Sequence, residues 1–329
     1  MKKSYLKYHL DFFTAFFFMF VVFGCNVTDS DIETPEEVVN ISHFTVENFP
    51  RVDGSTSNIP MMTVIACEIF KLSYNWWDAG DGTMVPYVLD DSTKTKEVDF
   101  VRSILFNKSI RAFNRLIYDS TDVILVANAP SADQLQTAAS QGVSFTIAPI
   151  ALDGIVFLLN SANPLNNLTS DQIIGIYSGE IKNWKEVGGN DSIINPYIRN
   201  PNSGSQVLME ELVMKNRIMI NAEEMILITM MGLIIKIVED PNGIGYSVYF
   251  YSSTMVPRND IKRISVNGIK PDPSTINSGA YKYTAPVYAI IRSNLDRNSN
   301  AYLFWKWLQT NAGQIAVAKS GYVSYSGKN

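Results

Sequence analysis

The stretch YIRNPNSGSQVLMEELVM, residues 197–214, places a cation beside a loop of hydroxyl and amide side chains, just before a helical pattern. Ser203, Gly204 and Ser205 can simply cap that helix, because such residues satisfy the free N–H groups of a first helical turn. They can also hold an anion, because a helix N-terminus offers N–H donors and a partial positive charge. Arg199 would add a planar fork of donors. Its alternative role is a surface ion pair, and the spacing leaves both open.

Three further polar turns precede expected helices. They are Ser55, Thr56 and Ser57 in VDGSTSNIPMM, Ser109 in NKSIRAF, where it could cap the helix, and Asn128 in VANAPSADQL. Each turn alone is more typical of a helix cap. Ligands of open α/β sheets bind beyond the carboxyl ends of the strands, where such turns lie. Four of them together therefore predict a site for a small anion.

The composition argues against catalysis and against nucleic acid. The chain of 329 residues has 27 Lys and Arg against 32 Asp and Glu, a net charge of −5, and no basic cluster. It has two His, His9 and His43, and two Cys, Cys25 and Cys67. This is too few for a Ser-His-Asp triad or a His-rich zinc site. We expect no metal, no cofactor, no nucleic-acid partner and no enzymatic activity.

Short apolar runs alternate with helical patterns from about residue 44 onward, which indicates an α/β protein. The expected strands are 122–128, 154–160 and 285–292; the expected helices are 61–70, 109–118, 170–179, 206–216, and a closing pair within 301–321. The apolar run 225–235 is too short to span a membrane and predicts a buried helix. Cys67 lies in an apolar helical stretch, where a buried thiol is expected.

The N-terminus has the pattern of a secretory signal. Three lysines precede an apolar run of about a dozen residues that ends at Gly24-Cys25. VFGC at 22–25 resembles a bacterial lipoprotein signal, with lipid attached at Cys25. An ordinary cleaved signal and a retained anchor are the alternatives. We expect residues 1–24 to be a signal peptide and residues 25–44, rich in acidic side chains, to be a lipidated tether.

Five segments carry a resemblance to a known family. They are DGSTSNIPM (53–61), residues 145–191 with IYSGEIKNW, RNPNSGSQVLMEELVM (199–214), NGIGYS (242–247) and WKWLQTNAGQIAVAKSGYV (305–323). They closely resemble the phosphate-binding lipoproteins of bacterial phosphate ABC transporters, over most of residues 50–325. The resemblance implies a two-lobed periplasmic-binding-protein fold (type II, Venus-flytrap) with two crossover strands. Lobe I would hold 45–148 plus 284–329, and lobe II would hold 149–283.

The resemblance also implies which residues bind phosphate. These are Ser55, Thr56, Ser57, Ser109, Asn128, Arg199, Ser203, Gly204 and Ser205. Two positions depart from the family pattern. Asn200-Pro201-Asn202 replaces a segment that usually contains glycine. Asn128 stands where the best-known relatives have an aspartate that accepts the proton of hydrogen phosphate and rejects sulfate. We therefore expect weaker selectivity against sulfate or arsenate, unless another acidic residue takes that part.

The function implied is an extracytoplasmic receptor that delivers inorganic phosphate to the permease of an ABC importer. We expect a monomer, held by lipid at Cys25 on the extracytoplasmic face of the cell membrane. One alternative is a receptor for another oxyanion, such as sulfate, arsenate or molybdate. Another is a signalling or adhesion lipoprotein that retains the fold. A phosphatase is disfavoured, because it would need a nucleophile with a base or a metal cluster.

Overall fold

A computed structural model describes residues 39–201, 203–215, 217–220 and 222–325. The predicted signal peptide, Cys25 and most of the predicted tether lie outside these residues. Within the described part, no helix is both long and apolar enough to cross a membrane.

The main sheet has eight strands, six of them in the order β1-β4-β13-β5-β10-β7, while β11 and β14 also pair with β5. Their bounds are β1 Val52–Gly54, β4 Val123–Val126, β5 Phe145–Asn160, β7 Asn195–Pro196, β10 Gly243–Val248, β11 Ile261–Arg263, β13 Thr284–Arg292 and β14 Val323–Ser324. The pairs β1–β4 and β7–β10 are parallel, whereas β5 pairs antiparallel with all its neighbours.

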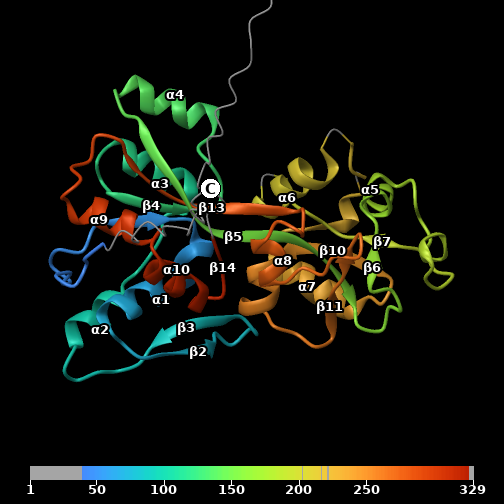
Figure 1. The fold of residues 1–329 in the computed structure, drawn as a ribbon. Helices are drawn as coiled ribbons and strands as arrows, with labels where there is room; N and C mark the ends of the chain where they lie inside the picture. The colour runs from blue at the N-terminus through green and yellow to red at the C-terminus, as the bar shows by residue number, and fades with distance from the viewer. Residues whose placement is uncertain (1–38, 202, 216, 221, 326–329) are drawn as a thin grey trace, which may run out of the picture. The chain divides into compact units, whose positions relative to one another are not determined.

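Strand β5 is the longest element and changes partner part-way along. Its segment Phe145–Gly154 pairs with β13, and from Ile155 onward it pairs with β10. Figure 1 shows β5 running from the elements around β4 and β13 to those around β10. One continuous strand thus belongs to both parts of the sheet.

Three two-stranded pairings complete the strands: β2 Tyr74–Asp78 with β3 Met84–Val88, β6 Asn167–Leu168 with β12 Ser265–Val266, and β8 Ile198–Arg199 with β9 Ile226–Leu227. The α-helices are α1 Ile59–Phe70, α2 Thr95–Arg102, α3 Lys108–Ile117, α4 Ala132–Ser140, α5 Ser170–Ser178, α6 Gly204–Leu208, α7 Met230–Glu239, α8 Pro273–Asn277, α9 Asn300–Trp307 and α10 Asn311–Lys319. Short 3-10 turns are η1 Thr56–Asn58, η2 Trp184–Val187 and η4 Glu223–Met225, and π-helical turns are η3 Met209–Met214 and η5 Tyr251–Met255.

The apolar side chains form separate cores on the two stretches of β5. One core joins α1, β4 and the closing helices, and includes Met61, Leu125 and Phe304. Another joins the second half of β5 to β10 and α5, and includes Phe157 and Tyr246. Burying such a side chain contributes about 1.5–3 kcal/mol, so each group of elements has its own source of stability. In Figure 1, α1 and α9 lie in the left part with β4, and α5 lies in the right part with β7.

Several expected elements are confirmed and one is wrong. The strands expected at 122–128 and 285–292 correspond to β4 and β13, and the closing helical pair to α9 and α10. Cys67 is buried as expected, and burial raises the pKa of its thiol to about 12. The run 225–235 is not one helix. Residues Ile226–Leu227 pair with β8, and α7 begins only at Met230, where the Thr229 hydroxyl accepts a hydrogen bond from Gly232 N.

Candidate anion-binding pocket

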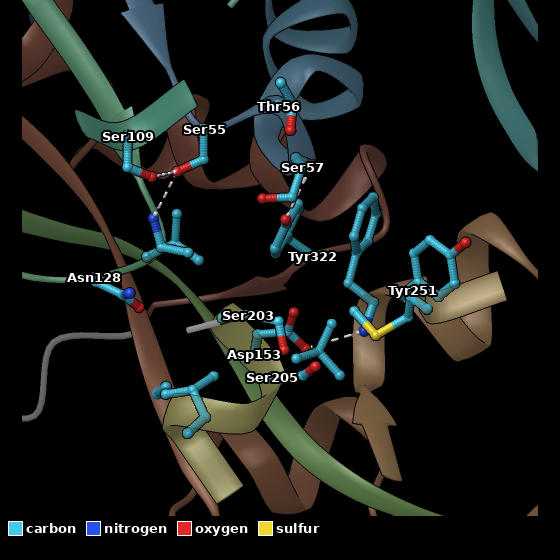
Figure 2. Close-up of a pocket in the computed structure, with 18 of the residues that line it drawn as sticks. Ser55, Thr56, Ser57, Ser109, Asn128, Asp153, Ser203, Ser205, Tyr251 and Tyr322 are labelled. Carbon is cyan, nitrogen blue, oxygen red and sulfur yellow. Dashed lines mark hydrogen bonds between the residues drawn. The ribbon is translucent and has the colours of Figure 1, made fainter. Parts of the chain in front are cut away.

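A cavity of about 450 Å³ lies beside β5 and brings the predicted site residues together. All nine of them line it: Ser55, Thr56, Ser57, Ser109, Asn128, Arg199, Ser203, Gly204 and Ser205. In Figure 2, the labelled hydroxyl side chains lie around the pocket on different sides. We call residues 55–57, 109 and 128 the hydroxyl side, and residues 199 and 203–205 the guanidinium side.

The hydroxyl side begins where β1 ends. A Cβ atom at Gly54 would lie 2.1 Å from the Leu125 carbonyl oxygen, so only glycine allows β1 and β4 to approach this closely. The close approach lets Ser55 N donate to Leu125 O at 2.9 Å. The Ser55 hydroxyl then lies 2.7 Å from the Ser109 hydroxyl and accepts from Ala127 N at 3.4 Å. The two hydroxyls that the sequence placed in separate turns are therefore in direct contact (Figure 2).

Ser109 lies in the first turn of α3 and does not cap it, so that expectation is wrong. The helix begins at Lys108, and its N-cap position is Asn107. The buried Asp53 carboxylate holds Asn107, accepting from its backbone N at 2.7 Å and from its amide at 2.9 Å. Lys108 itself lines the pocket with an exposed side chain.

Asn128 follows β4 and lines the pocket as an exposed side chain. In the same turn, Ser131 is the residue that caps α4, through a reciprocal pair of hydrogen bonds with Gln134. Asn128 and Ser131 therefore differ in role, although they are only three residues apart. The cap interpretation applies to Ser131, and Asn128 is left to face the cavity.

Arg199 dominates the guanidinium side and is only 7% exposed. Its Nε donates to Leu227 O and its Nη2 to Ile228 O, both at 3.0 Å. Its Nη1 donates to the Ser205 hydroxyl at 3.2 Å. These oxygens fix the orientation of the guanidinium but carry no full charge.

No described carboxylate forms an ion pair with Arg199. The surface ion pair considered from the sequence is therefore wrong for the described structure. Burial lowers the pKa of Arg199, because the charged form is taken out of water without a countercharge. A guanidinium in this state is poised to bind an anion.

The Ser203–Ser205 loop does not cap α6 as the sequence suggested. Ser203 occupies the N-cap position, but its side chain makes no capping hydrogen bond. Its hydroxyl is buried and has no hydrogen-bond partner among the described residues. Buried polar atoms are rarely left unpaired, so this hydroxyl is available to a ligand in the pocket.

The sequence interpretation missed Asp153, which also lines the pocket. Asp153 lies in β5, is 8% exposed, and accepts hydrogen bonds from Gly154 N at 2.8 Å and Phe250 N at 3.0 Å. Burial raises the pKa of Asp153 to about 7. The signal was present in ALDGIVFLL, where one acidic residue interrupts a strand of apolar side chains. Tyr251 and Tyr322, also missed, line the same cavity.

Comparison with known proteins gives the family. The family description of a PBP superfamily domain matches residues 84–311. The chain belongs to the PBP superfamily. Its periplasmic-binding-protein fold, expected from the sequence, is confirmed by solved structures. These include a putative phosphate ABC transporter substrate-binding protein with bound phosphate from Clostridium perfringens, with a TM-score of 0.60, 24% identity, and coverage of 85% of this chain and 100% of that one.

Other similar proteins have related names. An ABC-type phosphate transport receptor from Vibrio cholerae has a TM-score of 0.57 and 20% identity, with 83% of this chain and 98% of that chain covered. The phosphate-binding protein PstS of Borreliella burgdorferi is 28% identical over 200 residues, 59% of this chain and 70% of that protein. PstS of Staphylococcus epidermidis is 27% identical over 219 residues, 64% of this chain and 66% of that protein. The chain thus spans about two thirds of the length of these two PstS proteins.

Proposed function

We propose that this chain is a receptor that binds inorganic phosphate outside the cytoplasm and delivers it to the permease of an ABC importer. The observation that carries the proposal is Arg199, a buried guanidinium that lines a pocket of hydroxyl donors and has no described carboxylate partner. An isolated buried charge costs several kcal/mol, which a bound anion would offset. The names of the similar proteins select phosphate among the small oxyanions.

The position of the site suggests how binding would be coupled to a change of shape. The hydroxyl side comes from β1, α3 and β4, and the guanidinium side from β8 and α6, so an anion would bridge the two. We propose that residues 45–148 with 284–329 form one lobe, that 149–283 form the other, and that they close on the ligand. Contacts made only in the closed form would stabilise it. Most members of the two apolar cores fall on opposite sides of this division, whereas Phe250 belongs to the first core and Val323 to the second.

The membrane attachment is part of the same proposal. The VFGC sequence at residues 22–25 supports lipid attachment at Cys25, on the extracytoplasmic face of the cell membrane. The acidic segment that follows would act as a tether. Lipid analysis of the purified protein, with Cys25→Ser as the control, tests the anchor independently of ligand binding.

Titration calorimetry of the purified full chain against phosphate, sulfate, arsenate and molybdate tests the ligand. We expect saturable binding of phosphate at one site. Saturable binding of sulfate or molybdate without any measurable binding of phosphate would contradict the proposal and favour a receptor for another oxyanion.

A further inference from the structure

A second cation, Lys108, lines the same pocket as Arg199. Its side chain is exposed, and no described carboxylate forms an ion pair with it. Lys108 and Arg199 are the two cationic side chains among the described residues of the cavity wall. The net charge of the chain is −5, which opposes the approach of an anion at long range. An unpaired cation at the pocket acts against this repulsion.

The backbone of Lys108 lies in the left-handed region, with a φ of 67°. Residues other than glycine rarely adopt this region, because their Cβ atom then approaches a carbonyl oxygen too closely. Four other described non-glycine residues have a positive φ, and none of them lines the pocket: Lys71, Asp119, Lys215 and Asn267. Lys71 ends α1, where a left-handed residue is common. Lys108 instead begins a helix, α3, so its conformation needs another cause.

The residues on both sides of Lys108 are held in place. The buried Asp53 carboxylate accepts from Asn107 N at 2.7 Å and from the Asn107 amide at 2.9 Å. On the other side, the Ser109 hydroxyl lies 2.7 Å from the Ser55 hydroxyl (Figure 2). The chain therefore enters α3 between two anchored residues, through a left-handed Lys108. Such strain persists only where the surrounding structure imposes it, and it is concentrated at functional sites.

We propose that Lys108 binds the anion as a second cation and that its strained backbone holds it at the pocket. A phosphate dianion has two negative charges, and the guanidinium of Arg199 supplies one positive charge. The hydroxyls of Ser55 and Ser109 are neutral donors. The Lys108 ammonium, on a flexible four-carbon stem with three donors, neutralises the second charge from the α3 side. This inference rests on the proposed function and adds a binding residue to it.

The two cations act in different surroundings. Arg199 is 7% exposed and is held by backbone carbonyls, so its charge acts at low dielectric and is screened little by salt. Lys108 is exposed, so dissolved ions screen its charge. The contribution of Lys108 to binding therefore depends on ionic strength much more than that of Arg199. This difference gives the proposal a readout that a structural role of Lys108 would not produce.

Calorimetry of the full chain with phosphate at low ionic strength tests the charge. Lys108→Gln should weaken binding by about tenfold, the low end for a hydrogen bond to a charged group. Lys108→Arg keeps the charge and should keep most of the affinity. Lys71→Gln is the matched control, because Lys71 is also an exposed lysine with a positive φ, 54°, and does not line the pocket. It should bind phosphate as the wild type does.

The same titrations at rising sodium chloride concentration give the second readout. From about 0.01 M to about 1 M salt, the Debye length falls from about 30 Å to about 3 Å. The ratio of the wild-type affinity to that of Lys108→Gln should therefore fall from about ten toward one. Long-range repulsion by the rest of the chain is common to both proteins and largely cancels in this ratio. A ratio that stays constant contradicts an electrostatic role of Lys108.

Urea unfolding without ligand tests the strained backbone. Lys108→Gly and Lys108→Ala both remove the ammonium and should both bind phosphate about tenfold more weakly. The urea midpoint of Lys108→Gly should lie above that of Lys108→Ala, because glycine adopts a positive φ without steric cost. At an ordinary helical position the order is the reverse. A higher midpoint for Lys108→Ala contradicts the placement of Lys108 by backbone strain.

The outcomes separate the inference from the proposed function. A wild-type chain that does not bind phosphate contradicts the proposed function. A wild-type chain that binds phosphate no more tightly than Lys108→Gln contradicts the role of Lys108 alone. An equal loss in Lys108→Arg and Lys108→Gln also contradicts it, because the charge would then contribute nothing to binding.

Discussion

The hydroxyl side and the guanidinium side of the pocket differ in charge and in burial. Thr56, Ser57 and Asn128 on the hydroxyl side are exposed and neutral, and Ser55 is the one buried residue of that side. Arg199 and Ser205 on the guanidinium side are buried, at 7% and 4% exposure, and the guanidinium is held by backbone carbonyls. A buried charge acts at low dielectric, whereas exposed hydroxyls exchange one hydrogen bond for another with water. We therefore expect most of the binding free energy to come from the guanidinium side.

Removing the charge should have the largest effect. Arg199→Ala should weaken phosphate binding by about 2–5 kcal/mol, because it leaves a desolvated anion without its countercharge. Calorimetry of both proteins measures the loss. Arg217→Ala is the control: Arg217 forms an exposed ion pair with Glu180 at 3.4 Å and should leave the affinity unchanged. If Arg199→Ala and the wild type bound phosphate with equal affinity, the guanidinium side would not supply most of the binding free energy.

Asp153, which lines the same pocket, should make stability depend on pH. Its pKa is about 7 in the folded chain, against an ordinary value of 3.8. The folded state thus holds this proton more tightly, so its contribution is present at low pH and is lost as pH rises from about 4 to about 7. In urea unfolding without ligand, the unfolding free energy of Asp153→Asn relative to that of the wild type should rise by a few kcal/mol over that range. A constant difference in unfolding free energy would show that Asp153 titrates normally.

A smaller loss is expected at Ser205, whose hydroxyl accepts from Arg199 Nη1. Ser205→Ala should weaken phosphate binding by about 1–2 kcal/mol, since it removes one hydrogen bond and one support of the guanidinium. Calorimetry measures the change, and the melting temperature shows whether the fold is kept. A loss as large as that of Arg199→Ala would mean that positioning the guanidinium matters as much as its charge.

The smallest effect belongs to the exposed amide at position 128. Asn128→Ala should change the phosphate affinity by about 0.5 kcal/mol, the low end for one hydrogen bond, because water competes with the ligand there. The same titrations give this value. A loss of several kcal/mol would mean that the hydroxyl side supplies most of the binding free energy.

Local patterns were enough to predict much of the molecule. The apolar patterns of VILV in β4 and of α1 predict these two buried elements. The nine expected site residues all line one pocket. The errors arise where distant segments meet. Ile226–Leu227 leaves the helical pattern because it pairs with β8, and Asp153 enters the pocket because β5 passes beside it. The spacing of residues along the chain predicts neither contact.

The change of partner along β5 has a mechanical consequence. Gly154 pairs with Thr284 of β13 and Ile155 pairs with Val248 of β10, so β5 changes partner directly after Asp153. A rotation of the two parts of the sheet about this crossing would have its pivot there. Displacement in a rotation grows with distance from the pivot. Outer loops would sweep a long arc during the closure we propose, while the Asp153 carboxyl would hardly move. Asp153 would then keep its place in the pocket while the two sides approach each other.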